Sequence, residues 1–258
     1  MSNPPDPATI ELFWKLHEGL PMQGPGSDAS TRRALSLVPG LRDEPDILDL
    51  GCGPGRQSIV LAAETGGRVT AIDALPPFLK QLDQRAQDAG LGDRITTRTA
   101  SMGELSDYPD ESFDLLWSEG AIYNIGFESG LRSWHRLLRP GCAVAVTEAT
   151  WLTEAAPQKV REFWQTEYPE MQNLEDNERA IERAGYRPLG SFVLPENEWW
   201  EGYYTPIEER LAVLREERSD PEWQAAVAEN DREIAVVREG LKHFGYVFYV
   251  MQKEAAKG

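Results

Sequence analysis

Cysteine and histidine are scarce in this chain of 258 residues, which holds two cysteines and three histidines. Cys52 and Cys142 provide no disulfide framework, and their separation matches no zinc-ligand spacing. His17, His135 and His243 stand far apart and form no metal-ligand pattern. We therefore expect a protein that depends on neither disulfides nor a bound metal.

Long apolar runs are also missing. No run approaches the ~18 residues that a helix needs to cross a bilayer. The first residues, MSNPPDPATIELFW, lack a basic segment followed by an apolar stretch, which is the pattern of a secretory signal. The sequence thus predicts a cytoplasmic protein with no membrane partner.

Basic residues are few relative to acidic ones. The chain has 26 Lys and Arg against 43 Asp and Glu, which gives a formal net charge of -17. Such a charge repels polyanions at long range, so we expect no nucleic-acid partner. Two explanations of the charge stay open: attraction of a cationic substrate, and a solubility or salt adaptation spread over solvated helix faces.

Strand and helix patterns alternate regularly from about residue 46. Hydrophobic residues make up 41% of the chain, enough for the core of one α/β domain with an elaboration. The predicted strands are 47–50, 68–72, 94–99, 113–117, 142–147, 188–194 and 244–251, and the helices predicted among the first five are 56–65, 76–89 and 128–138. Apolar strands separated by helices indicate a parallel sheet covered on both faces.

A glycine-rich turn, Asp49-Leu-Gly-Cys-Gly-Pro-Gly-Arg-Gln57, follows the first of these strands and opens a helix. Glycine lets the backbone approach a ligand without a Cβ clash, and helix starts offer free N–H groups. A dinucleotide-binding turn in this register requires Gly or Ala at position 56, where the chain has Arg56. The spacing, Gly51-x-Gly53-x-Gly55, therefore argues against a nicotinamide-dependent oxidoreductase, which we keep as the weakest alternative.

A second carboxylate ends the next strand. Asp73 follows Val69-Thr-Ala-Ile, about 20 residues past the glycine turn. An acid at the tip of the adjacent strand can accept two hydrogen bonds from a ribose diol. Taken alone, Asp73 also suits the role of cap for the helix that begins near Pro76. Together with the glycine turn, it favours a nucleoside-binding edge.

These segments together resemble class I S-adenosylmethionine-dependent methyltransferases. The glycine turn resembles motif I of that family, where the carboxylate at the strand end suits the ammonium group of the cofactor. Further along, residues 100–102 fall where the family binds the adenine edge, residues 113–118 resemble its fourth-strand motif, and residues 137–142 resemble its L-x-P-G-G turn. The whole chain also resembles a group of bacterial methyltransferases of similar size and unknown substrate that carry WSEGAIYNIGFE and LPEN-W.

The resemblance implies an α/β, Rossmann-like, three-layer fold. It implies a seven-stranded, mostly parallel sheet with an antiparallel last strand, N-terminal helices and a helical insertion before that strand. The implied cofactor is S-adenosyl-L-methionine. The residues expected to bind it are Gln23, Gly24, Asp49, Gly51, Cys52, Gly53, Gly55, Gln57, Asp73, Ala74, Ser101, Met102 and Ser118.

We expect three functional segments. Residues 1–45 are predicted to form an N-terminal helical lid, with Ser27 or Asp28 capping its second helix. Residues 46–258 are predicted to form the methyltransferase domain. Within it, residues 195–242 are predicted to form a helical cap over the acceptor pocket or a contact in a homodimer.

The methyl acceptor is a separate question, because a fold does not specify it. The sequence lacks the Asn-Pro-Pro-Tyr motif of amino-methylating nucleic-acid enzymes and the metal-binding carboxylates of the catechol type. Near the ends of the fourth and fifth strands it has Glu119, Tyr123 and Glu148, acids and an aromatic ring that suit a cationic amine. We predict these three as catalytic residues for a small-molecule acceptor. The more specific version of this prediction is that the acceptor is an amine.

Other roles compete with these assignments. The spacing of Glu119 and Glu128 resembles the double-glutamate loop of protein arginine methyltransferases, but acids are also common at helix starts, where Glu128 falls. Tyr123 is also a candidate for the core. A protein that binds the cofactor without turnover is the alternative from another class. The lack of an obvious nucleophile does not argue against a methyltransferase, because in-line placement of the acceptor can supply much of the rate enhancement.

Overall fold

The computed structural model describes residues 12, 14–20, 22–217 and 220–254. The sequence pattern also predicts a helix from Ile10 to Leu20 with Thr9 as its cap, and the start of that helix lies outside the described residues. Within them, none of the helices is long and apolar enough to cross a membrane.

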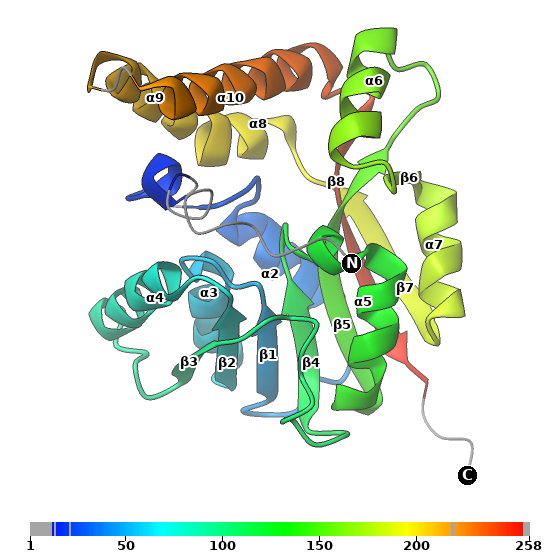
Figure 1. The fold of residues 1–258 in the computed structure, drawn as a ribbon. Coiled ribbons are helices and arrows are strands. Elements are labelled where there is room, and N and C mark those ends of the chain that lie inside the picture. The colour runs from blue at the N-terminus through cyan, green and yellow to red at the C-terminus, as the bar shows by residue number, and fades with distance from the viewer. Residues whose placement is uncertain (1–11, 13, 21, 218–219, 255–258) are drawn as a thin grey trace.

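One mixed sheet of eight strands runs through the described part of the chain (Figure 1). Its main path is β3-β2-β1-β4-β5-β8-β7, and the short β6 pairs with β5. The strand β8 is antiparallel to β5 and to β7, which confirms the mostly parallel sheet with an antiparallel last strand. The seven strands of the main path match the prediction, and β6 is an addition to it. The bounds are β1 (Asp46–Leu50), β2 (Arg68–Asp73), β3 (Ile95–Thr99), β4 (Phe113–Ser118), β5 (Leu138–Trp151), β6 (Gln172–Asn173), β7 (Tyr186–Val193) and β8 (Phe244–Lys253).

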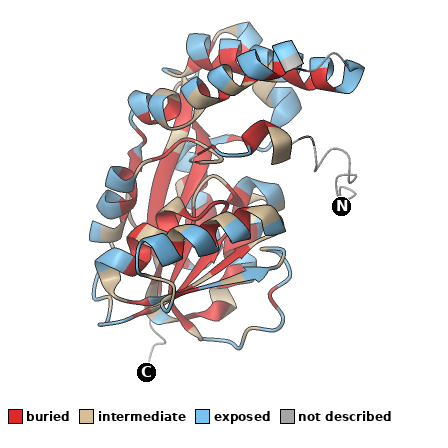
Figure 2. Ribbon diagram, turned by 90° about the vertical axis from the view of Figure 1, so that its left-hand side faces the viewer, coloured by how far each residue is buried: buried red, intermediate tan, exposed pale blue. Residues whose placement is uncertain are grey.

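Helices cover both faces of the sheet, as the sequence pattern predicted. On one face lie α2 (Asp28–Ser36), α3 (Arg56–Thr65) and α4 (Pro76–Asp88), and on the other lie α5 (Phe127–Trp134) and α7 (Leu174–Arg183). Side chains alternate along a strand. Ile47 of β1 therefore packs in the hydrophobic core under α2, α3 and α4, and Leu48 packs in the core under α5 and α7. Figure 2 shows the resulting buried sheet between helices whose outer faces are exposed.

Local signals set most helix ends. The Ser27 hydroxyl accepts a hydrogen bond from the Ser30 N–H at 3.1 Å, so the predicted cap at Ser27 is confirmed. The prediction of a helix over 128–138 was wrong at its end. The helix α5 stops at Trp134, a 3₁₀ turn, η2 (His135–Leu137), follows, and Leu138 already pairs with Phe113 of β4. This pairing is a long-range effect that the local helical pattern does not contain.

Residues 196–240, called the cap below, form a helical layer above the carboxyl ends of the strands (Figure 1). Their elements are α8 (Glu196–Trp199), the π-helical turn η3 (Trp200–Tyr204), α9 (Thr205–Glu217) and α10 (Pro221–Gly240), with α6 (Gln158–Glu167) beside them. A third hydrophobic core joins Trp199 and Leu211 of the cap to Leu16, before α2, and to Phe244 of β8. The cap is therefore packed onto both the N-terminal segment and the sheet.

Candidate functional site

The glycine turn joins β1 to α3 at the carboxyl edge of the sheet. Gly51, Gly53 and Gly55 all have positive φ angles, of 74°, 52° and 82°. A Cβ atom on Gly53 would meet nothing closer than the Gln23 side chain at 3.4 Å, whereas one on Gly55 would overlap Leu82 of α4. The absence of a side chain at Gly53 thus keeps the backbone open to a ligand, while at Gly55 it allows two helices to pack.

Asp49 braces this turn from within the protein. It is fully buried, and its carboxylate accepts hydrogen bonds from the Ser58 hydroxyl at 2.5 Å and from the Gln57 amide at 3.3 Å. Burial raises its pKa to about 7, from an ordinary 3.8, because the charged form loses its water. The Gln57 amide also donates to the Cys52 carbonyl at 3.1 Å. The predicted contact between Asp49 and the cofactor's ammonium group stays a prediction.

Asp73 connects the turn to the end of β2. Its carboxylate accepts from the Gly53 N–H at 2.9 Å and from the Leu75 N–H at 2.8 Å. Burial raises its pKa, although these backbone hydrogen bonds favour the charged form. A carboxylate has about four acceptor positions, so Asp73 can still accept from a ribose diol. The exposed Ala74 follows it directly.

The Gln23 amide is the polar group that best indicates a ligand. Both its oxygen and its nitrogen are buried without a hydrogen-bond partner, and its side chain lies against the Gly53 position. Buried amides in folded proteins are normally paired. A polar ligand between Gln23 and the glycine turn would supply these partners. The residues present therefore fit S-adenosylmethionine, which Gln23, the backbone at Gly53 and the carboxylate of Asp73 would hold, and these roles stay predictions.

The remaining predicted cofactor residues divide into two groups. Cys52 is 1% exposed and packs in the core, and the Ser118 hydroxyl donates to the Leu50 carbonyl at 2.8 Å, so both side chains belong to the scaffold. Ser101 and Met102 follow β3, and the Met102 methyl group would lie 2.7 Å from a Cβ on Gly51. A Cβ on Gly24 would meet nothing within 4 Å. The structure thus gathers the predicted residues at one edge, and their contacts with the cofactor stay predictions.

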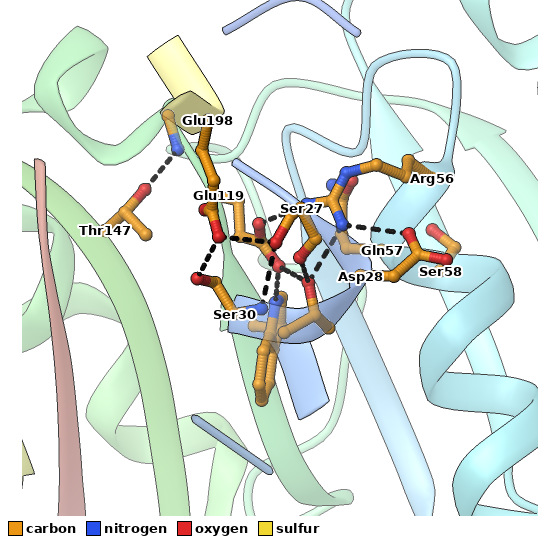
Figure 3. A network of polar contacts seen from close by, with 12 residues as sticks. Ser27, Asp28, Ser30, Arg56, Gln57, Ser58, Glu119, Thr147 and Glu198 are labelled. Carbon is orange, nitrogen blue, oxygen red and sulfur yellow. Dashed lines mark hydrogen bonds and ion pairs between the residues drawn. The ribbon is translucent and has the colours of Figure 1, made fainter. Parts of the chain in front are cut away.

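Glu119, predicted to contact the acceptor, lies in a network of polar side chains (Figure 3). Its Oε2 accepts from the Arg56 guanidinium at 2.5 Å, and its Oε1 accepts from the Thr31 hydroxyl at 2.7 Å and the Trp117 indole at 2.8 Å. The side chains of Arg56 and Glu119 are 14% and 5% exposed. The negative charge of Glu119 is therefore already matched by a cation from α3, and its predicted role toward the acceptor stays a prediction.

The same network reaches the cap. The hydroxyls of Ser27 and Ser30 donate to Glu198 Oε1 of α8 at 2.6 Å and 2.7 Å (Figure 3). Backbone packing follows the same path, since a Cβ on Gly26 would lie 3.2 Å from the Arg56 guanidinium, and one on Gly202 would lie 3.1 Å from the Gly26 carbonyl. Residues 22–27, called the N-terminal loop below, are thus held between the glycine turn and the cap.

Glu148 of β5 has a different environment. It is 2% exposed, and its Oε2 is buried without a hydrogen-bond partner. Burial raises its pKa to about 8, from an ordinary 4.5, against the effect of a hydrogen bond with Tyr168 and together with the nearby charge of Glu170. At neutral pH this carboxyl therefore holds its proton most of the time, and it is poised to exchange it.

Five tyrosines lie around the carboxyl end of β5, and we call them the tyrosine cluster: Tyr123, Tyr168, Tyr203, Tyr204 and Tyr246. The rings of Tyr123 and Tyr168 meet edge to face, with centroids 5.9 Å apart. Tyr123 is 43% exposed, so this predicted catalytic residue is not part of the core. Beyond Tyr168 lies a cavity of about 630 Å³, lined also by Trp151, Trp164 and Met171.

Some of these residues had no motif to indicate them. Tyr168, Tyr246 and Glu233 come from three elements that lie far apart in the sequence. One signal was present for Glu233, because it lies seven residues after Ala226 and four before Val237, which are both buried on the apolar face of its helix. Glu128, by contrast, pairs with Arg132 and Arg183 on the outside of α5. No three His, Cys, Asp or Glu side chains of the described residues are grouped so as to hold a metal ion.

The fold and the turn define a nucleoside-binding α/β domain, and comparisons with known proteins give its class. Residues 47–141 match the methyltransferase domain family. The chain is 28% identical over 204 residues to 27-O-demethylrifamycin SV methyltransferase of Amycolatopsis mediterranei, an alignment that covers 74% of this chain and 71% of that protein. It is 33% identical over 134 residues to malonyl-[acyl-carrier protein] O-methyltransferase of Salmonella typhimurium, covering 51% of this chain and 48% of that protein.

Solved structures share the fold. The structure of an S-adenosylmethionine-dependent methyltransferase from Geobacter sulfurreducens in complex with S-adenosyl-L-homocysteine has the same fold, with a TM-score of 0.81 and 18% identity over 98% of this chain and 100% of that one. These similarities support a class I S-adenosylmethionine-dependent methyltransferase, with residues 47–141 as its methyltransferase domain. Its cofactor is S-adenosyl-L-methionine, and this assignment replaces the nicotinamide alternative.

Proposed function

We propose that the chain methylates the nitrogen of a small-molecule amine held at Glu148. The observation that carries the proposal is the buried carboxyl of Glu148, one oxygen of which has no partner. A buried carboxylate without a cation is costly, and a bound ammonium group would be its natural partner. The faces of Tyr123 and Tyr168 favour the same ligand, because aromatic rings attract cations.

The chemistry requires removal of one proton. When bound, S-adenosylmethionine supplies a methyl group whose S–C bond breaks, with its electron pair left on sulfur, as the N–C bond forms. An ammonium ion has no lone pair for this attack, so the ionised form of Glu148, which a bound cation would favour, must first accept a proton from it. A carboxyl whose pKa is about 8 is close enough to an alkylammonium ion for this exchange. Glu148 then releases the proton to water, and the methylated product keeps the positive charge.

A panel of amines tests the proposal. Formation of S-adenosylhomocysteine is measured for the natural chain and for Glu148→Gln, with calorimetric titration of S-adenosylhomocysteine as the control for an intact cofactor site. We expect turnover of at least one amine and a loss of about 100-fold in kcat for the variant, the scale of general-base catalysis. Equal rates for the two proteins, or no turnover of any amine, would contradict the proposal.

A hydroxyl acceptor is the second candidate. The similarity to 27-O-demethylrifamycin SV methyltransferase favours it, because that protein's name describes transfer to oxygen. Glu148 would then take the hydroxyl proton. The same assay with alcohols and phenols in place of amines distinguishes the two, since Glu148→Gln lowers turnover only for the true acceptor class.

A further inference from the structure

The cavity beside Tyr168 lies between α6 and the start of α7, which stand one above the other in Figure 1. Its walls come from the loop after β5, from α6, from β6 and from the first turn of α7. Along α6 and its C-terminal end, Arg161, Trp164 and Tyr168 line it at spacings of three and four residues, so they share one face of the helix. At the rise of an α-helix, this lined face is about 10 Å long.

The volume and the walls of this cavity suit a body with several rings. A cavity of about 150 Å³ is large enough for one benzene molecule, and this one measures about 630 Å³. Trp151 and Trp164 line it, and their rings pack against Phe244 with centroids 6.3 Å and 5.0 Å apart. The aromatic walls are therefore held in place by the core, and they offer ring surfaces to a ligand. A short aliphatic amine would leave most of this space empty.

The charged side chains of the lining are largely engaged within the protein. The Arg161 guanidinium donates hydrogen bonds to two backbone carbonyls of the loop after β5. Glu175 and Asp176 both pair with Arg179, and Glu154 is exposed at the rim. Acids thus outnumber bases in the lining, which favours the approach of a cationic amine, while the inner surface is left to the apolar rings.

The cavity is continuous with the edge of the sheet that carries the glycine turn. A Cβ atom on Gly51 would lie 2.5 Å from the Cβ of Ala121, so the segment after β4 lies directly against the turn. Two residues later comes Tyr123, whose ring meets that of Tyr168 with centroids 5.9 Å apart. Tyr168 in turn lines the cavity. A molecule in the cavity is thus separated from the methyl-transfer edge by the tyrosine pair alone, and half of Tyr123 is open to solvent.

We infer that the acceptor is an arylalkylamine whose body of two or more rings lies in this cavity, while its amine reaches past Tyr168 to Glu148. The inference rests on the proposed function, because it assigns the reacting nitrogen to Glu148. The rings fix the part of the acceptor that does not react, and this positions the nitrogen for transfer. Trp151 and Trp164 are then the residues that select a ring-bearing amine over a short aliphatic one.

A series of three amines tests this selection. n-Butylamine, 2-phenylethylamine and 2-(2-naphthyl)ethylamine are titrated by calorimetry into the protein saturated with S-adenosylhomocysteine, and turnover is then measured with S-adenosylmethionine. We expect affinity to rise along the series, with the two-ring amine binding at least about 10-fold more tightly than n-butylamine.

A variant that fills the cavity locates the bound rings. Leu174 lines the cavity and is 40% exposed, so Leu174→Trp narrows the cavity without disturbing the core, and it should weaken the two-ring amine at least about 10-fold. Val193→Trp is the matched control, since Val193 is 44% exposed on β7 and does not line the cavity, and it should keep the preference. Leu174→Ala widens the rim and should keep it too. Titration of S-adenosylhomocysteine into each variant verifies that the cofactor site is intact.

The outcomes separate the inference from the proposed function. If all three amines bind and react equally well, and Leu174→Trp changes none of them, the inference is wrong while the proposed function stands. If no amine yields S-adenosylhomocysteine, the proposed function fails, and the titrations still report whether the cavity binds rings. Loss of the preference in Leu174→Ala or Val193→Trp as well would show that it does not come from the space inside the cavity, and this result would overturn the inference.

Discussion

The ion pair of Arg56 and Glu119 allows a quantitative test of how the site is built. Arg56→Met keeps the length of the side chain but leaves the Glu119 carboxylate, 5% exposed, without its cation. Breaking a buried ion pair by removing one partner costs about 3–5 kcal/mol. Glu119 keeps its hydrogen bonds from Thr31 and Trp117, so we expect the low end, about 3 kcal/mol of unfolding free energy.

Urea unfolding followed by tryptophan fluorescence measures this loss. For a chain of this size the same change lowers Tm by roughly 6–12 °C. The informative comparison is the double variant Arg56→Met with Glu119→Gln, in which no charge is stranded. We expect it to recover at least half of the lost free energy. If the double variant is no more stable than Arg56→Met alone, the penalty does not come from the charge of Glu119, and our reasoning about the network is refuted.

Four further predictions concern the turn and its acids. Gly53→Ala, at a φ of 52°, should cost about 1–2 kcal/mol of stability and weaken S-adenosylhomocysteine binding at least tenfold in calorimetry, because the new methyl group occupies the ligand face. Gly55→Ala should destabilise the protein more in urea unfolding, because its Cβ overlaps Leu82, and equal losses for the two glycines would count against this difference. Asp73→Asn should weaken binding of S-adenosylhomocysteine by about 1–2 kcal/mol, and unchanged affinity would remove Asp73 from the ribose site. The pKa of Glu148 in the folded protein, about 8, lies above the ordinary 4.5, so folding takes up a proton between these pH values and stability falls as pH rises through them. We therefore expect Glu148→Gln to be more stable than the natural protein at pH 8 but not at pH 4. A pH-independent difference between the two proteins in urea unfolding would contradict this.

Most of the fold was predictable from the sequence because its signals are local. The helix α3 has the predicted bounds, since Gly55 and Gly66 mark its two ends, and β1 and β2 are short segments rich in apolar residues. The end of α5 was missed because Leu138 belongs to β5 only through its pairing with Phe113 of β4. These two residues lie 25 positions apart in the sequence, so no local pattern contains the pairing. The π-helical turn η3 had no signal in the aromatic run that forms it.

The candidate site was predictable to a smaller extent. Motif spacing located Asp49, Gly53 and Asp73 on adjoining strand ends, because parallel strands bring their carboxyl ends to one edge. Nothing in the sequence paired Glu119 with Arg56, since an ion pair between a residue just after β4 and one on α3 depends on the packed geometry. The difference between Glu119 and Glu148, one neutralised and one unpartnered, likewise emerges only in three dimensions.

The placement of the N-terminal loop has a consequence for the time course of catalysis. Gln23 lies over Gly53, while Gly26 is packed between the Arg56 guanidinium and Gly202 of the cap. We predict that a nucleoside bound beneath Gln23 departs only when the loop separates from the turn, and that this motion also requires the cap to move. On this prediction, the residence time of the spent nucleoside depends on contacts between two distant stretches of the chain. A substitution at Gly202 would change that residence time without touching the nucleoside.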